Sequence, residues 1–387
     1  MQLSVTWLLA LFLALPAYAS EMSTLNSSVR ALGMGDAFTA VATDGDSLFY
    51  NPAGLARVKG LNWKIFDVGA GTSGVSEYSK LTNLKSGSGS SFANSLSSLY
   101  GDHVWVGAGG ESIFTMPCLG FGVYDHAGTM IQVDNPVYPQ MHTKLINDLG
   151  YVAGVGVPIG PFVHIGGDLK YIKRTGTDMT AGPGLIADLQ SSSITSEFTQ
   201  WGTGYGADLG ATFIIPAPMF SAAFSAAWKN VGGLTFRSTG NSQIPSEPNN
   251  ITLGSALTFD LPLITITPAV DMTYLTDNEF QLARKLNFGI EVGLPIFDLR
   301  AGFREGYYTA GLGMNMGLFR VDAATYGVEL GEYPGQIEDR RYVVQFTMKL
   351  GVGNFSASDD GKKKGSKKGS SADTESFWGT GRLKQRR

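Results

Sequence analysis

Residues 286–304 read LNFGIEVGLPIFDLRAGFR, and this stretch decides the fold class. From 286 to 294 every second residue is large and apolar, and the residues between them are polar or glycine. Successive side chains of a β-strand point to opposite faces, so the pattern predicts a strand with one apolar and one polar face. If Pro295-Ile296 is a two-residue turn, the next strand returns antiparallel and Glu291 lies opposite Arg300.

The same period of two recurs along the chain, at 205–215, 220–228, 251–259 and 342–350. A soluble β-sandwich and a transmembrane barrel both produce such alternation, so the period alone leaves both open.

The connections between these strands favour the barrel. Short links alternate with longer polar links along the chain. The short links carry Pro or Gly and lie at 158–161, 216–218, 261–262, 295–296 and 317–318. The longer polar links lie at about 174–200, 231–249, 276–282 and 328–339. Transmembrane barrels have short periplasmic turns and longer external loops. The short external link Glu305-Gly306 is an exception.

The sequence predicts an all-β fold, a 14-stranded antiparallel transmembrane barrel over residues 61–350. An even number of strands places both ends on the periplasmic side. The predicted strands are 61–70, 104–114, 117–125, 151–157, 162–173, 201–215, 219–230, 250–260, 263–275, 283–294, 296–304, 307–316, 318–327 and 340–350.

Composition excludes several other classes. Charged residues make up 16% of the chain, against roughly 25% in an average soluble domain. The single cysteine, Cys118, excludes a disulfide framework, and the four histidines lack metal-ligand spacing. We therefore expect no metal, no cofactor and no nucleic acid. We also expect no enzyme activity, because no Ser/His/Asp-type constellation is visible.

Both termini carry segments outside the predicted barrel. An apolar run at 8–15 followed by Pro16 and Ala17-Tyr18-Ala19 predicts a signal peptide, residues 1–19, with a buried N-terminal helix as the alternative. Residues 351–387 form a Gly-, Ser- and Lys-rich basic tail, which we expect to be disordered and periplasmic. Two readings of this tail stay open: contact with an anionic periplasmic partner, or no partner.

Residues 28–56, SVRALGMGDAFTAVATDGDSLFYNPAGLA, are the most specific motif. The segment resembles the N-terminal plug, or hatch, of the FadL-like superfamily of outer-membrane proteins, with Asp36 where a third Gly is common. The resemblance implies that residues 20–60 lie inside a 14-stranded barrel. The predicted plug-motif residues are Arg30, Gly33, Gly35, Phe38, Phe49, Asn51, Pro52, Ala53 and Gly54.

Further stretches look like the PorV/PorQ branch of this superfamily: 204–210, 228–233, 300–313 and 320–331. FadL proper carries long-chain fatty acids and related hydrophobic compounds inward. The PorV branch instead acts with protein-secretion machinery.

The polar face of the strands is expected to line the lumen, with seven acidic and seven basic residues and one histidine. Such a balanced set indicates ion pairs that brace the interior, or a polar path for a ligand. The set is His164, Asp168, Lys170, Asp208, Lys229, Asp260, Asp271, Lys285, Glu291, Asp298, Arg300, Arg304, Arg320, Asp322 and Lys349.

Aromatic residues near the strand ends are expected to form the interfacial girdles, or to cap a soluble core if the fold is a sandwich. They are Trp63, Trp105, Trp201, Trp228, Tyr151, Tyr171, Tyr274, Tyr307 and Tyr342.

These observations predict a multi-pass protein of the outer membrane of a Gram-negative (diderm) bacterium, in contact with outer-membrane lipid. The expected function is passive transport of fatty-acid-like hydrophobic molecules through a plugged barrel, with Arg30, Phe38 and Phe49 as candidate ligand contacts. The alternative is a PorV-like scaffold or shuttle for secreted proteins, with external links 71–103 and 174–200 as docking surfaces.

Overall fold

The computed structural model describes residues 21–23, 25–73, 101, 103–134, 140–181, 200–238, 244–278 and 280–352. Four predicted segments lie wholly or partly outside the described residues. They are the signal peptide, most of the external link 71–103, residues 182–199 of the link 174–200, and the basic tail beyond 352. Within the described ranges, no helix is both long and apolar enough to cross a membrane.

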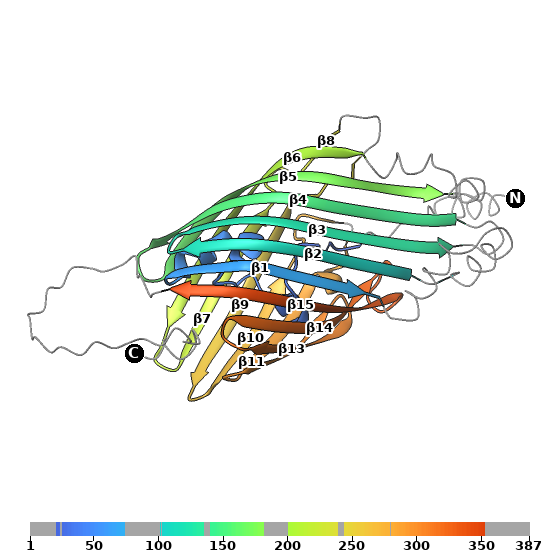
Figure 1. The fold of residues 1–387 in the computed structure, drawn as a ribbon. Coiled ribbons are helices and arrows are strands. Elements are labelled where there is room, and N and C mark those ends of the chain that lie inside the picture. Colours follow the sequence, from blue (N-terminus) through green and yellow to red (C-terminus); the bar gives the residue numbers. More distant parts are fainter. Residues whose placement is uncertain are drawn as a thin grey trace, which may run out of the picture.

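The strands form one closed antiparallel sheet, which confirms the predicted barrel (Figure 1). Neighbours in sequence pair with each other, β15 pairs with β1, and β8 (Arg237–Ser238) is a two-residue addition beside β6. The fourteen long strands are β1 (Leu61–Thr72), β2 (His103–Met116), β3 (Leu119–Asp134), β4 (Gln140–Ile159), β5 (Val163–Ala181), β6 (Trp201–Pro216), β7 (Phe220–Lys229), β9 (Asn250–Leu261), β10 (Ile264–Met272), β11 (Leu286–Gly293), β12 (Phe297–Arg304), β13 (Tyr307–Asn315), β14 (Phe319–Glu329) and β15 (Glu338–Val352).

Closure places both ends of the barrel sequence at one end of the cylinder, because Leu61 at the start of β1 pairs with Val352 at the end of β15. The tight turns at 117–118, 160–162, 262–263 and 295–296 all follow inward-running strands and lie at this same end. Glu291 pairs directly with Arg300 across the 295–296 turn, as the sequence predicts.

Several strands exceed their predicted bounds by a few residues, and three are much longer than predicted. β3 continues to Asp134, β4 begins at Gln140 rather than 151, and β5 reaches Ala181. Figure 1 shows β2–β5 extending beyond the other strands on one side. The prediction ended β3 early and began β4 late because residues 126–150 lack clean alternation. In the structure, pairing between β3, β4 and β5 keeps the additional residues of all three strands extended.

β1 contains an irregularity that the alternation did not predict. The register shifts between Lys64 and Phe66 on one side and between Lys64 and Asp67 on the other. A β-bulge inserts one extra residue, so the inward face changes parity there. As a result, both Lys64 and Asp67 point inward although they are three residues apart.

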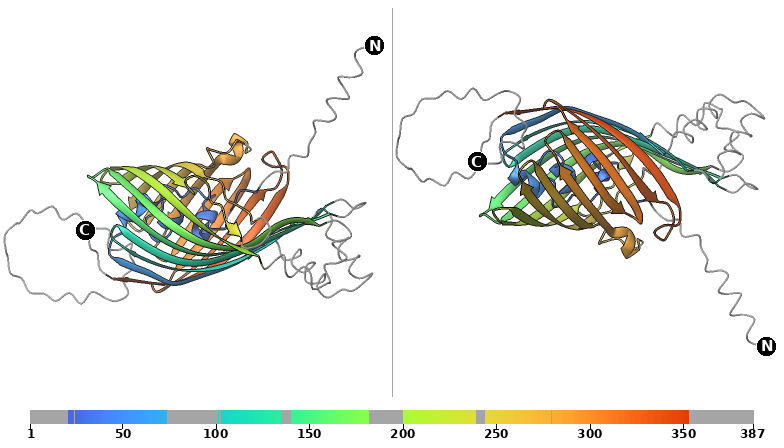
Figure 2. Two further views of the ribbon diagram at one scale, coloured as in Figure 1. Left: turned by 90° about the horizontal axis from the view of Figure 1, so that it is seen from above. Right: turned by 90° about the horizontal axis from the view of Figure 1, so that it is seen from below.

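The N-terminal segment, residues 25–60, lies within the ring of strands (Figure 2). It contains the short helices α2 (Val29–Gly33) and α3 (Ser47–Tyr50) and the 3₁₀ helix η1 (Pro52–Arg57). Its apolar side chains form the main core cluster together with inward side chains of the strands, and Ala31, Met34, Phe38, Leu48 and Leu55 are fully buried. A further short helix, α7 (Leu282–Lys285), precedes β11 at the other end of the barrel.

The outer face carries an apolar band. It starts at Phe162, in the turn before β5, and runs along β5 to Tyr171, and Lys173 follows two residues later. The nine steps from residue 162 to residue 171, at about 3.3 Å each and tilted by about 40°, cover roughly 23 Å along the barrel axis, close to the ~25 Å apolar band of transmembrane barrels.

Candidate ligand site inside the barrel

The helix α2 is joined to the barrel wall by an ion-pair network. Arg30 donates to both carboxylate oxygens of Glu291, at 2.8 and 2.7 Å. Arg300 donates to the same carboxylate at 2.7 Å and to Asp322 at 2.8 Å. Since Arg300, Glu291 and Asp322 are all nearly fully buried, each charge relies on these partners, and loss of one would leave another buried and unpaired.

The loop after α2 approaches the wall closely. Gly35 has φ +64, and a Cβ at this position would lie 2.5 Å from the carbonyl oxygen of Phe288 in β11. Asp271 of β10 accepts hydrogen bonds from the backbone N–H groups of Phe38 (2.9 Å) and Thr39 (2.8 Å). The wall therefore fixes both the path and the distance of the segment at this point.

Asn51 and Pro52 begin η1 and pack on β5 and β6. The Asn51 side chain accepts from the backbone N–H of Ala53 at 3.0 Å and donates to the Thr212 hydroxyl at 3.1 Å. Gly210 of β6 makes room for this side chain, because a Cβ there would lie 2.0 Å from the Asn51 Oδ1 atom.

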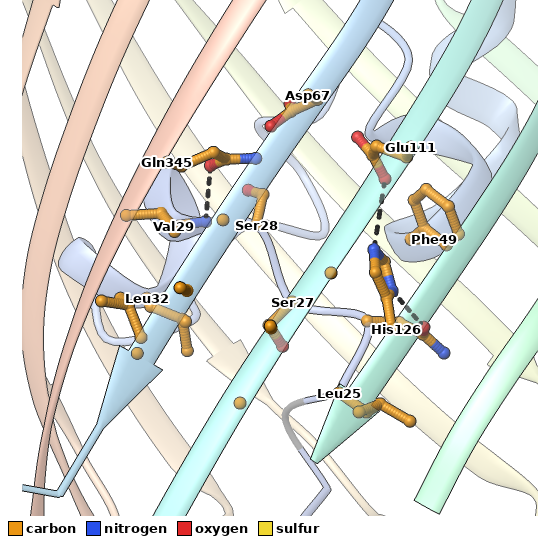
Figure 3. Close-up of a pocket in the computed structure, with 18 of the residues that line it drawn as sticks. Leu25, Ser27, Ser28, Val29, Leu32, Phe49, Asp67, Glu111, His126 and Gln345 are labelled. Atoms are coloured by element: carbon orange, nitrogen blue, oxygen red, sulfur yellow. Dashed lines mark hydrogen bonds and ion pairs between the residues drawn. The ribbon is translucent and has the colours of Figure 1, made fainter.

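A pocket with a cavity volume of about 100 Å³ lies between the N-terminal segment and the inner wall of β1–β3. Figure 3 shows Val29 and Leu32 on one side, Phe49 on the opposite side and Leu25 below His126. Its lining also includes Trp105 of β2. Most of the lining is therefore apolar, and both the segment and the barrel contribute to it.

One side of the pocket is acidic. Asp46 of the N-terminal segment, Asp67 of β1 and Glu111 of β2 all line it. The ammonium of Lys64 contacts all three carboxylates, with 2.9 Å to Glu111 and 3.5 Å to Asp67. Burial raises the pKa of the Asp46 carboxyl, but the charge and hydrogen bond of Lys64, together with Arg30 and the Ser28 hydroxyl, hold this pKa below its usual range. Asp46 is therefore ionised at neutral pH.

His126 of β3 lies beside this acidic group. Its Nε2 atom is 3.9 Å from Glu111, and Nδ1 is 3.0 Å from the side-chain oxygen of Asn26 (Figure 3). Its ring lies over Gly109, where a Cβ would be only 2.3 Å from the ring. The sequence predicts His164 as the one histidine in the lumen, and this is wrong. The strand β3 continues past residue 125, and His126 lies on its inner face.

Glycine and alanine make the wall thin behind the pocket. Gly69 of β1 pairs with Gly109 of β2, and Gly71 pairs with Gly107. The Trp105 ring covers this wall from inside, with ring atoms 2.4 Å from where a Cβ of Gly107 would lie. The register between β1 and β2 is nevertheless continuous here, so the wall is closed.

At the other end of the barrel, the described residues of the segment 230–249 (230–238 and 244–249) fold against β4–β6. Arg174 of β5 is fully buried, binds Asp148 through a 2.6 Å hydrogen bond, contacts Glu247 and donates to the Pro245 carbonyl at 2.8 Å. Burial raises the pKa of the Glu247 carboxyl, but Arg174, Lys170 and the Asn230 amide together lower it below its usual range. This ionised pair holds the segment to the wall.

The predicted lumen-facing residues lie on the inner face. His164, Asp168, Asp208, Asp271, Glu291, Arg300, Arg304 and Asp322 are buried, and Lys170 and Arg320 are half-buried. They are brought together in separate groups, such as Lys170 with Asp208 at 2.8 Å and Arg320 with Asp322 at 2.6 Å. Asp260 is the exception: it is exposed at the end of β9, where it faces Thr265 across the turn.

The predicted plug-motif residues play different structural parts. Phe49 lines the pocket, whereas Arg30 and Phe38 do not: Arg30 binds Glu291, and Phe38 packs edge-on against Tyr50. Gly33 approaches Gly311 of β13, and the remaining motif residues, Asn51, Pro52, Ala53 and Gly54, are buried in and before η1.

Six of the nine predicted girdle aromatics lie on the outer face. Tyr151, Tyr171 and Tyr205 form a ladder across β4–β6, although Tyr205 was not among those predicted. Three predictions are wrong. Trp105 and Tyr307 point inward, because they have the opposite parity in their strands, and Tyr274 lies in the link after β10, against Phe280.

The acidic side of the pocket was not found from sequence. Asp67 was missed because of the β1 bulge, and Glu111 lies between Gly110 and Ser112, where alternation is weak. Among the described residues, no group of three or more His, Cys, Asp or Glu side chains could hold a metal ion.

No protein-family model matches the chain, and no curated protein matches it. Solved structures similar to it include the toluene transporter TbuX of Ralstonia pickettii, with a TM-score of 0.47 and 12% identity over 82% of this chain and 97% of that one. The Pseudomonas putida toluene transporter TodX is similar with a TM-score of 0.44 and 10% identity, over 82% of this chain and 96% of that one. The translocator domain of the autotransporter NalP from Neisseria meningitidis has a TM-score of 0.34 and 9% identity, over 75% of this chain and 88% of that one. The fold assignment rests on the strand pairing of this chain itself.

Proposed function

We propose that this protein is an outer-membrane barrel through which a small hydrophobic molecule crosses passively, and that the pocket beside Phe49 binds this molecule on its way. The observation that carries the proposal is a largely apolar pocket enclosed between the N-terminal segment and the barrel wall. The segment acts as the plug in this proposal.

The outer surface supports the membrane location. Large apolar side chains such as Leu169, Tyr205 and Phe224 are half or more exposed, which is costly in water but favourable in lipid. A closed sheet also leaves no unpaired strand edge in hydrocarbon. The tyrosine ladder followed by Lys173 is typical of the boundary between the apolar band and the headgroup region.

The interior supports a binding-and-release route rather than an open pore. The N-terminal segment packs into the lumen through the buried contacts of Arg30, Asn51 and the backbone at Phe38, so free diffusion of solutes is opposed. The thin Gly and Ala wall at 69–71 and 107–109 is the place where a bound molecule lies nearest to the lipid. Release needs movement of the segment or of this wall.

The cavity volume sets the size of the molecule. An engineered protein cavity of roughly 150 Å³ binds benzene, so a pocket of about 100 Å³ suits a ligand of about one ring, or one end of a longer chain.

Uptake and bound ligand test the proposal together. The full-length protein, extracted in mild detergent, is expected to retain a hydrophobic small molecule that mass spectrometry detects, and a deletion strain is expected to take up apolar compounds more slowly. Complementation with the wild-type gene is the control. Normal uptake in the deletion strain, combined with secreted proteins trapped in the periplasm, would refute transport and favour the secretion scaffold.

A further inference from the structure

We propose that the pocket beside Phe49 selects molecules that carry a positively charged amine on a small apolar body, with Asp67 and Glu111 receiving the ammonium group. This inference rests on the proposed function, since it names the class of molecule that the transport pocket takes.

The first observation is an excess of carboxyl groups over basic groups at one side of the pocket. Asp46, Asp67 and Glu111 line the pocket, and within the described part of the chain Lys64 is the one Lys or Arg within 4 Å of any of them. One ammonium therefore faces three carboxylates. Because this one ammonium is shared among three buried carboxyl groups, a second cation would be stabilised on this side of the pocket.

The second observation is an acceptor with unused capacity. Asp67 is 3% exposed, and its Oδ1 atom has no hydrogen bond of good geometry among the described residues, although the Gln345 amide lies beside the carboxyl. Lys64 reaches the other oxygen of this carboxylate at 3.5 Å, which is long for a charged hydrogen bond. Asp67 can thus accept a hydrogen bond from a group inside the pocket without losing an existing one.

The third observation is the apolar remainder of the pocket. Around the carboxylates, Phe49 lies beside Glu111, Val29 lies on the side of Gln345, and Leu25 lies further away, so the rest of the lining supplies aliphatic and aromatic surface (Figure 3). An inorganic cation would leave this surface uncovered, and a purely apolar molecule would leave the carboxylates uncompensated. A protonated amine with one ring or a short alkyl chain satisfies both sides.

A charge series of probes tests the inference on the wild-type, full-length protein in detergent. Benzylamine, benzyl alcohol, toluene and benzoate differ little in size but carry a cation, a neutral polar group, no polar group and an anion. We expect benzylamine to bind at least tenfold more tightly than benzyl alcohol or toluene, and benzoate to bind most weakly. Equal or tighter binding of toluene would overturn the inference while leaving the proposed function intact.

Variants locate the site. Asp67→Asn removes the charge at constant shape, and loss of one charge-assisted hydrogen bond predicts roughly tenfold weaker benzylamine binding with toluene binding unchanged. Asp260→Asn is the matched control, because this carboxylate is exposed at the end of β9. Glu111→Gln serves as the second variant, and heat-dependent gel mobility checks that each barrel has folded.

The outcomes separate the two proposals. Benzylamine binding that Asp67→Asn and Glu111→Gln both leave unchanged would overturn the assigned site. Failure of all four probes to bind the wild-type protein would overturn the pocket's role in the proposed function as well.

Discussion

The contact between Gly35 and β11 determines how firmly the N-terminal segment stays docked, and Gly35→Ala tests it. The position has φ +64, where an L-residue costs roughly 1–2 kcal/mol. The added Cβ would also lie 2.5 Å from the Phe288 carbonyl oxygen and 2.8 Å from that of Phe303, and such overpacking costs about 1–3 kcal/mol.

Together these effects disfavour the docked segment by about 2–5 kcal/mol, since both act only when the segment lies against the wall. Because 1.4 kcal/mol corresponds to a factor of ten, the ratio of undocked to docked protein rises roughly 30- to 3,000-fold. The variant is therefore expected to show frequent current steps in planar bilayers, and trypsin is expected to cleave after Arg30 and Arg57, both within the segment.

Gly160→Ala is the matched control. Gly160 has φ +70 in the turn between β4 and β5, but a Cβ there would meet nothing within 4 Å. It therefore carries the backbone strain without the clash. Equal conductance and equal trypsin sensitivity of the two variants would refute the reasoning that the close approach of Gly35 holds the segment in place.

Three further changes test other contacts of the interior. Asp271→Ala leaves two buried backbone N–H groups of the N-terminal segment without an acceptor, so we expect the barrel to lose about 2–4 kcal/mol, measured as a lower guanidinium midpoint; an unchanged midpoint would contradict this. Arg174→Met removes the cation that binds Glu247 and the Pro245 carbonyl, so trypsin cleavage after Arg237 should become at least tenfold faster. Protection equal to wild type would show that other contacts suffice to hold this segment to the wall. Gly109→Val places a side chain where the His126 ring lies, so ligand retention and uptake should fall at least fivefold, and wild-type uptake would argue against the pocket assignment.

Local patterns predicted much of the barrel because they reflect interactions between neighbours in sequence. The Glu291–Arg300 pair followed from a two-residue turn, since the turn length fixes the register of a hairpin. The inward position of His164 followed from alternation alone. The same rule failed at Asp67, because one bulge in β1 reverses the parity of every residue after it. Trp105 was misplaced for a different reason: it was assigned to the girdle because it stands near a strand end, and its parity in β2 was not used.

The candidate site depends on contacts that no local pattern encodes. Asp67 and Glu111 meet Lys64 through the pairing of β1 with β2, and Asp46 joins them only because the N-terminal segment lies inside the closed sheet. The sequence by itself determined that strands form, how many there are and which face meets lipid, because backbone geometry and alternation are local properties. Only the tertiary structure decided which charges gather beside the apolar pocket, because that depends on how the segment and the wall pack in three dimensions.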